Sequence, residues 1–170
     1  MNPENLKVVT KDKISTLSKT LTAADIHFLI EELNEKDDKL RYNAFLLLQS
    51  HSLLFPSVYE CWGELKKKLD SENSYQRSLG IMLIAENVRW DKDNKFSKTI
   101  SKYLRCCNDE KFITARQTIQ GLETIVKATD KFDREIEQGI LSLQFSWYKE
   151  NQQKLLKKDA SNLLRAIEKR

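Results

Sequence analysis

The sequence is poor in proline and glycine. It contains two prolines and only four glycines, at Gly63, Gly80, Gly121 and Gly139. A β-sheet protein with many tight turns needs more of both, because these residues supply the backbone angles of such turns. All four glycines fall in stretches of helical periodicity, where each costs about 1 kcal/mol relative to alanine. We therefore expect an all-α chain in which close contact between helices compensates at some of these positions.

Long apolar runs are also lacking. No stretch approaches the roughly 18–20 consecutive apolar residues that cross a bilayer. The first residues, MNPENLKVVTKDK, have no apolar segment of the kind found in secretory signals. The three cysteines, Cys61, Cys106 and Cys107, form an odd set without the spacing of a disulfide framework. These features favour a reducing compartment, and we expect a cytoplasmic protein without a membrane partner.

Over most of the chain, acidic and basic residues balance, so neither sign of charge is in excess. The formal net charge is +4, and residues 149–170 carry seven basic and three acidic side chains, which account for all of it. The other residues carry equal numbers of acidic and basic side chains, which is not typical of a chain that binds nucleic acid along its whole length. Only the C-terminal end is basic enough to meet a phosphate backbone or an acidic protein surface.

Apolar residues recur at helical spacing in four places. The first stripe follows Thr22, a typical helix N-cap, with Asp25 in the next turn. The others follow Pro56, the polar run DKDNK and the segment TDKFD. The stripes are Ile26, Leu29, Ile30 and Leu33; Val58, Cys61, Trp62, Leu65 and Leu69; Phe96, Ile100, Tyr103, Leu104 and Cys107; and Ile136, Ile140, Leu143 and Trp147. We interpret them as the first helices of four pairs.

The second helices repeat more clearly. Basic residues stand 36, 39 and 41 positions apart, at Arg41, Arg77, Arg116 and Lys157. A polar residue precedes each by seven positions: Asn34, Asp70, Asp109 and Glu150. A mostly small residue follows by three positions and a leucine by six: Ala44, Gly80, Ile119 and Ala160, then Leu47, Leu83, Leu122 and Leu163. Such a period, with two helices per unit, is typical of an α-helical solenoid.

The repeats predict one domain over residues 1–170. A single helix pair cannot bury its apolar face, whereas stacked pairs share a continuous core. We predict a right-handed α-α superhelix of four helix pairs, preceded by a short cap over residues 1–20, where Ile14, Leu17 and Leu21 indicate a brief helix. The predicted pairs occupy residues 22–53, 56–91, 95–129 and 132–168, approximately.

The repeats resemble the HEAT/armadillo-like family. In its pattern an acidic turn precedes a helix that opens with a basic residue, followed by a small residue and leucines, as in DSENSYQRSLGIMLIA and DEKFITARQTIQGLETI. The residue before the basic one, usually valine in that family, is leucine, glutamine or alanine here. The run SENSYQRSLGIMLIAENVRWDKDNK followed by NDEKFITARQTIQGL also looks like small bacterial HEAT-like proteins often labelled SufBD. The resemblance implies a compact helical-repeat protein, and the label implies iron–sulfur cluster assembly.

No set of residues has the pattern of a catalytic, cofactor or metal site. Cys106 and Cys107 are adjacent on a predicted helix, where side chains point about 100° apart and cannot face one ion. One of them fits the apolar stripe, so we expect core packing, and a reactive thiol is the open alternative. His27 and His51 share no motif with a serine or cysteine nucleophile. We therefore predict a non-enzymatic protein without cofactor or metal.

The repeated basic residues have two interpretations. They line a face that binds an acidic partner, or they pair with turn carboxylates such as Asp70 and Asp109 and fasten neighbouring repeats; the second is favoured. Partly exposed pairs of this kind contribute about 0–1 kcal/mol each. The leading functional prediction is a scaffold or interaction module that binds another protein in the concave groove of the second helices. The predicted partner-binding residues are Asn43, Arg77, Gln117, Gln120 and Lys158.

The main alternative is nucleic-acid binding with repair chemistry. The Trp90-Asp91 pair is similar to a feature of the alkylpurine DNA glycosylases built on HEAT-like repeats, which hold a flipped base in a basic groove. The basic side chains available for this role are at the C-terminal end, at Lys154, Lys157, Lys158 and Arg165. The interpretation we favour for Trp90 is an aromatic anchor that covers the gap between repeats.

Overall fold

The computed structural model describes residues 1–170 and is all-helical. Helices account for 74% of the chain and no strand is present, which confirms the all-α prediction. The α-helices are α1 (Pro3–Lys7), α2 (Lys11–Leu17), α3 (Ala23–Glu32), α4 (Asp38–Ser52), α5 (Trp62–Lys68), α6 (Ser74–Asn87), α7 (Ile100–Arg105), α8 (Phe112–Ala128), α9 (Asp133–Leu141) and α10 (Glu150–Glu168). Short 3-10 helices are η1 (Ser18–Thr20), η2 (Ser57–Cys61), η3 (Val88–Trp90), η4 (Phe96–Lys98) and η5 (Cys106–Asn108).

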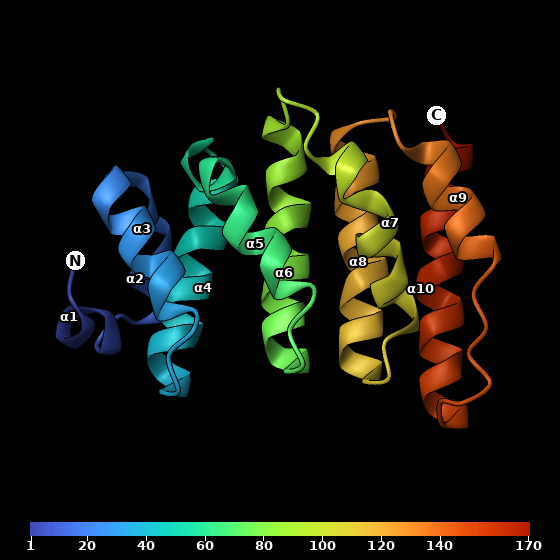
Figure 1. Cartoon of the computed structure of the whole chain (residues 1–170), viewed down its shortest axis with the longest axis horizontal. Helices are drawn as coiled ribbons and strands as arrows, with labels where there is room; N and C mark the ends of the chain where they lie inside the picture. Colours follow the sequence, from blue (N-terminus) through green and yellow to red (C-terminus); the bar gives the residue numbers. More distant parts are fainter.

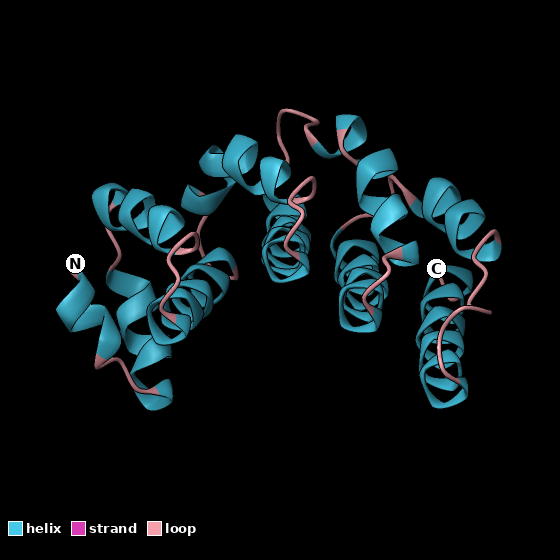
Figure 2. Cartoon of the chain, turned by 60° about the horizontal axis from the view of Figure 1, so that its bottom comes forward, coloured by secondary structure: helices cyan, strands magenta, loops and turns pink.

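The helices form two layers. Helices α4, α6, α8 and α10 lie side by side in chain order, each packed against the next (Figure 1). Helices α3, α5, α7 and α9 cover one side of this row, and α1 and α2 pack against α4 at the N-terminal end. Figure 2 shows that both layers curve into an arc with α4, α6, α8 and α10 on its inner side. We call the side of this row that faces away from α3, α5, α7 and α9 the inner face.

Local hydrogen bonds explain where α3, α4 and α6 begin. At α3, the Asp25 N–H donates to Thr22 Oγ1 at 3.2 Å, and the Thr22 N–H donates to Asp25 Oδ2 at 3.0 Å. This capping box satisfies two donors that the helix leaves unpaired and confirms Thr22 as the N-cap. At α4 and α6 the N-cap side chains of Asp37 and Asn73 accept backbone N–H groups of the first turn.

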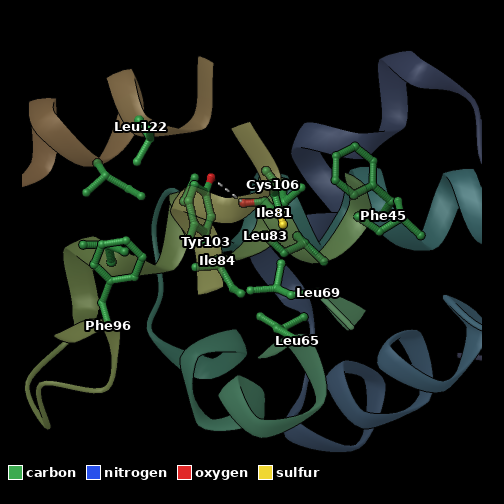
Figure 3. Close-up of a cluster of buried hydrophobic side chains, with 14 of the residues drawn as sticks. Phe45, Leu65, Leu69, Ile81, Leu83, Ile84, Phe96, Tyr103, Cys106 and Leu122 are labelled. Atoms are coloured by element: carbon green, nitrogen blue, oxygen red, sulfur yellow. Dashed lines mark hydrogen bonds between the residues drawn. The ribbon is translucent and has the colours of Figure 1, made fainter. Parts of the chain in front are cut away.

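One apolar core runs between the two layers. The leucines at the repeated position, Leu47, Leu83, Leu122 and Leu163, are all fully buried. Figure 3 shows Leu83 and Leu122 in this core together with Phe96 and Tyr103. Because equivalent leucines of successive inner helices contribute to one cluster, no helix pair has a core of its own.

Gly80 allows α5 and α6 to approach closely. A methyl group at this position would lie 2.8 Å from Lys68 Cβ and 2.9 Å from the carbonyl oxygen of Leu65, both on α5. The carbonyl belongs to a helix backbone and cannot rotate away, so a side chain would push the helices apart. The expectation that helix contact accounts for some of the glycines is confirmed here.

The fourth stripe departs from the prediction. Helix α9 ends at Leu141 and residues 142–149 form a loop, so Trp147 does not extend the helical face and is 54% exposed. Tyr148 is buried in its place and donates a hydrogen bond to the Asp109 carbonyl oxygen. The prediction that Trp147 lies on a helix is wrong. Apolar residues continue at helical spacing after Leu141, although the backbone leaves the helix there.

Candidate protein-interaction surface on the inner face

An apolar groove of about 500 Å³ spans the first halves of α4, α6 and α8 on the inner face. Its apolar lining consists of Tyr42, Phe45, Tyr75, Leu79, Met82 and Ile113. Three of these side chains protrude strongly: Tyr42 is 41% exposed, Tyr75 40% and Ile113 59%. Aromatic and aliphatic side chains gathered around a hollow, with polar groups between them, are typical of protein interfaces. We call this surface the inner-face groove.

Contacts between repeats hold the groove in shape. The Arg41 guanidinium of α4 lies 4.3 Å from the centre of the Tyr75 ring of α6, a cation–π contact that orients the tyrosine. Arg41 also donates to the Glu35 carbonyl oxygen at 2.8 Å, which fixes its own position. Between α6 and α8, the Ser78 and Thr114 hydroxyl oxygens are hydrogen-bonded at 3.1 Å. The groove is therefore largely preformed.

A smaller hollow of about 180 Å³ continues toward the second halves of α6 and α8. It is mostly polar and includes Gln49, Glu86, Gln117 and Gln120. Gln117 lines both hollows, and its Oε1 atom is buried without a hydrogen-bond donor. Burial also raises the pKa of the Glu86 carboxyl. This part of the inner face therefore adds polar side chains beside the apolar groove.

Two predicted partner-binding residues are engaged inside the protein. Asn43 is buried, and its amide donates to the carbonyl oxygens of Leu6 at 2.9 Å and Val9 at 3.2 Å. It thus attaches the N-terminal cap to α4 and presents nothing to a partner, which corrects the prediction. The Arg77 side chain is 12% exposed and serves a contact between repeats. Of the remaining three, Gln117 and Gln120 lie on the inner face, while Lys158 is exposed on α10, outside the groove.

The repeated basic residues pair with a carboxylate of the next helix pair at two of four positions, whereas Arg41 pairs with Asp38 on its own helix. Arg77 Nε and Nη2 donate to Asp109 Oδ2 and Oδ1 at 2.6 and 2.8 Å, and this pairing raises the pKa of Arg77. Arg116 Nε donates to Asp159 Oδ2 at 2.8 Å. The partner expected at Asp70 is wrong, since that carboxylate pairs with Lys102.

The fourth basic residue, Lys157, is exposed on α10. It forms no ion pair, so it fastens nothing. Its position in the repeat is that of Arg77, which pairs with Asp109. The same sequence position therefore has a different role at the end of the row.

Trp90 and Asp91 have structural roles. The Trp90 indole N–H donates to the Ser52 carbonyl oxygen at 2.7 Å, which ties η3 to the end of α4 and confirms the anchoring interpretation. Asp91 accepts hydrogen bonds from the Tyr59 hydroxyl at 2.9 Å and from the backbone N–H groups of Lys95 and Phe96 at 2.7 and 2.9 Å. Both residues are occupied by contacts that build the loop before η4.

All three cysteines are buried thiols. Cys106 and Cys107 both pack in the core, although the stripe predicted this for one of them. Burial raises the pKa of Cys106 to about 11 and that of Cys107 further. No three side chains of histidine, cysteine, aspartate or glutamate come together as metal ligands.

We expect thiol reagents to label Cys106 and Cys107 only when the protein unfolds. Near pH 8, a thiol with a pKa of about 11 is about 0.1% thiolate, whereas an unfolded cysteine is roughly one quarter thiolate. Absorbance after addition of a thiol-reactive disulfide, with and without denaturant, measures the difference. Complete labelling of the native protein within minutes would contradict the buried placement.

The groove residues Tyr42, Tyr75 and Ile113 were missed at the sequence level. Tyr42 directly follows the repeated basic residue, at the position that Ser78 and Gln117 hold in later repeats. The sequence does contain one indication of the groove: an aromatic residue stands in the first repeat where the later repeats have polar residues. It is visible only when the copies are aligned and their differences, rather than their shared residues, are examined.

No protein-family model matches the chain, and no curated protein matches it. None of its helices combines the length and apolar composition required to cross a lipid bilayer. The geometry of the inner face therefore supplies the observations from which a function is inferred.

Proposed function

We propose that this protein is a HEAT-like helical solenoid and acts as a non-enzymatic interaction module that binds another protein in the inner-face groove. The observation that carries the proposal is the exposure of Tyr42, Tyr75 and Ile113 around one apolar hollow. Tyrosine is enriched among the residues that dominate binding energy at protein interfaces. A row of helix pairs also offers a long surface for a partner.

The chemistry of the groove favours a partner segment with apolar side chains. Burial of apolar area contributes roughly 25 cal/mol per Å², and the protruding tyrosines and isoleucine supply that area. Because Arg41 already orients Tyr75, little side-chain entropy is lost when a partner binds. Beside the hollow, the side chains of Gln117 and Gln120 add polar groups to the same face.

The substitutions Tyr75→Ala and Ile113→Asp are expected to abolish partner capture without unfolding the protein. Loss of an interface anchor worth at least 2 kcal/mol weakens binding about 30-fold or more. Leu141→Ala is the matched control, because Leu141 is 68% exposed and lies on α9, outside the groove. Affinity capture from source cells identifies the partner, and titration of the purified partner then measures its Kd for each variant. Equal weakening by Leu141→Ala, or none by the groove variants, would refute the proposed site.

Nucleic-acid binding is tested in the same preparations. If the exposed lysines of α10 held a phosphate backbone, affinity for duplex or single-stranded DNA would fall steeply with added salt. We expect no binding at low salt, since Trp90 and Asp91 are engaged in loop contacts. A role in holding an iron–sulfur cluster would give coloured protein with bound iron, and we expect neither.

A further inference from the structure

A second groove, between α3, α5 and α6, contains a buried lysine. This groove has a volume of about 410 Å³, and Lys68, Asn34 and Gln76 all line it. Lys68 is 7% exposed, and its Nζ atom donates to Asn34 Oδ1 at 2.8 Å and Gln76 Oε1 at 2.5 Å. Both acceptors are uncharged amides, and the neighbouring Glu64 carboxylate pairs with Lys67 instead. A buried ammonium ion without an anionic partner is strongly disfavoured.

The two hydrogen bonds of Lys68 can be made by a neutral amine as well as by an ammonium ion. A neutral lysine has two N–H bonds, and the oxygens of Asn34 and Gln76 accept both. The fourth direction around the nitrogen then holds a lone pair, whereas the charged form would place a third N–H there without a protein acceptor. Burial lowers the pKa of Lys68 to about 8; the Glu64 carboxylate partly offsets this effect and the Arg41 guanidinium adds to it. The other titratable groups that line the groove are His27, Glu31 and Lys67.

We propose that Lys68 is a modification site, where the amine accepts an acyl group from a small activated donor, an acyl phosphate or an acyl thioester. The nitrogen lone pair attacks the acyl carbon, and a carbon–nitrogen bond forms as the bond to the phosphate oxygen or the thiolate sulfur breaks. The leaving group takes the bonding electrons and the nitrogen gives one proton to water. The product is an uncharged amide, and no oxidant or reductant takes part.

Acylation changes the junction between the first two helix pairs. The amide nitrogen keeps one N–H, so either Asn34 or Gln76 loses its donor. Gln76 also donates from Nε2 to the Leu33 carbonyl oxygen at 2.7 Å, and in this way links α6 to the end of α3. Modification at Lys68 therefore removes part of a bridge that joins α3, α5 and α6.

Reaction with acetyl phosphate tests the site. Near pH 7.5, about one quarter of an amine with a pKa of about 8 is neutral, compared with about 0.1% of an ordinary lysine. Because burial slows the approach of the donor, we expect the initial rate of acetylation at Lys68 to exceed that at Lys127 and Lys154 by about tenfold. This is less than the ratio of the neutral fractions. Those two lysines are 69% and 74% exposed. Peptide mass spectrometry at early times gives each rate.

The pH profile and one variant separate a reactive amine from a merely structural lysine. The Lys68 rate is expected to level off above about pH 8, while the exposed lysines continue to react faster up to about pH 10. Asn34→Asp places a carboxylate beside Nζ without a change of shape, so the ammonium form gains a partner and the Lys68 rate near pH 7.5 falls at least fivefold. Lys127 and Lys154 serve as internal controls. Acetylation at Lys68 no faster than at these controls, or no slower in Asn34→Asp, would overturn the proposal.

Discussion

Replacement of Gly121 by alanine is expected to lower the free energy of unfolding by about 3 kcal/mol. A methyl group on Gly121 of α8 would overlap the Tyr103 hydroxyl oxygen and lie 3.3 Å from Ala85 Cβ. Tyr103 is fully buried and donates to the Ile81 carbonyl oxygen at 3.1 Å, the dashed contact in Figure 3. The methyl group forces the ring away and breaks this bond, which outweighs the gain of about 1 kcal/mol in helix propensity.

Denaturant unfolding followed by circular dichroism measures the effect. Gly63→Ala is the matched control, because nothing lies within 4 Å of a methyl group on Gly63 of α5, and we expect it to be neutral or stabilising. Tyr103→Phe removes the overlapping oxygen, so the combined Tyr103→Phe and Gly121→Ala protein should lose at least 1 kcal/mol less than the sum of the single losses. Strict additivity, or equal stability of the two alanine variants, would show that Tyr103 does not occupy this space.

Arg77→Ala is expected to lower the free energy of unfolding by a similar amount, about 3 kcal/mol. The side chains of Arg77 and Asp109 are 12% and 6% exposed, so removal of the cation leaves a buried carboxylate without its partner. Arg77 Nη1 also donates to the carbonyl oxygens of Ser71 at 2.8 Å and Glu72 at 3.0 Å. The substitution therefore frees the turn before α6 as well as the turn before α8.

A graded comparison distinguishes this contact from an ordinary surface ion pair. Arg116 is 33% exposed and donates to Asp159, so Arg116→Ala is expected to cost only about 1 kcal/mol. A double-mutant cycle of Arg77→Ala and Asp109→Ala should give a coupling of at least 1 kcal/mol. If Arg116→Ala proved the more destabilising variant, Arg77 would not be the principal fastener between repeats.

Much of the helical architecture could be predicted because the relevant signals are local. The cap at Thr22, the apolar stripe after it and the buried leucine at Leu83 depend on spacing along a single helix. The contacts of the repeated basic residues were less predictable. Arg41 and Arg77 occupy the same repeat position, yet one lies over a tyrosine ring and the other pairs with a buried carboxylate.

The candidate site was predicted only in outline. Gln117 and Gln120 lie on the predicted inner face, but the aromatic residues that form its apolar groove were not identified. Asn43 looked like an exposed polar residue, and it is buried because the N-terminal helices fold back over α4 and supply two carbonyl acceptors. Asn43 and Leu6 of α1 are 37 positions apart, and the periodicity of a single helix does not predict contacts over such a separation.

The sequence by itself determined that this chain forms helices in pairs, since apolar spacing, capping residues and the scarcity of glycine and proline act within each helix. Tertiary structure decided which polar residues remain available. It buried Asn43, paired Arg77 with Asp109, left Lys68 without a counterion and exposed Tyr75. Exposure and charge pairing depend on which side chains of neighbouring helices meet. The spacing of residues along a single helix does not identify those contacts.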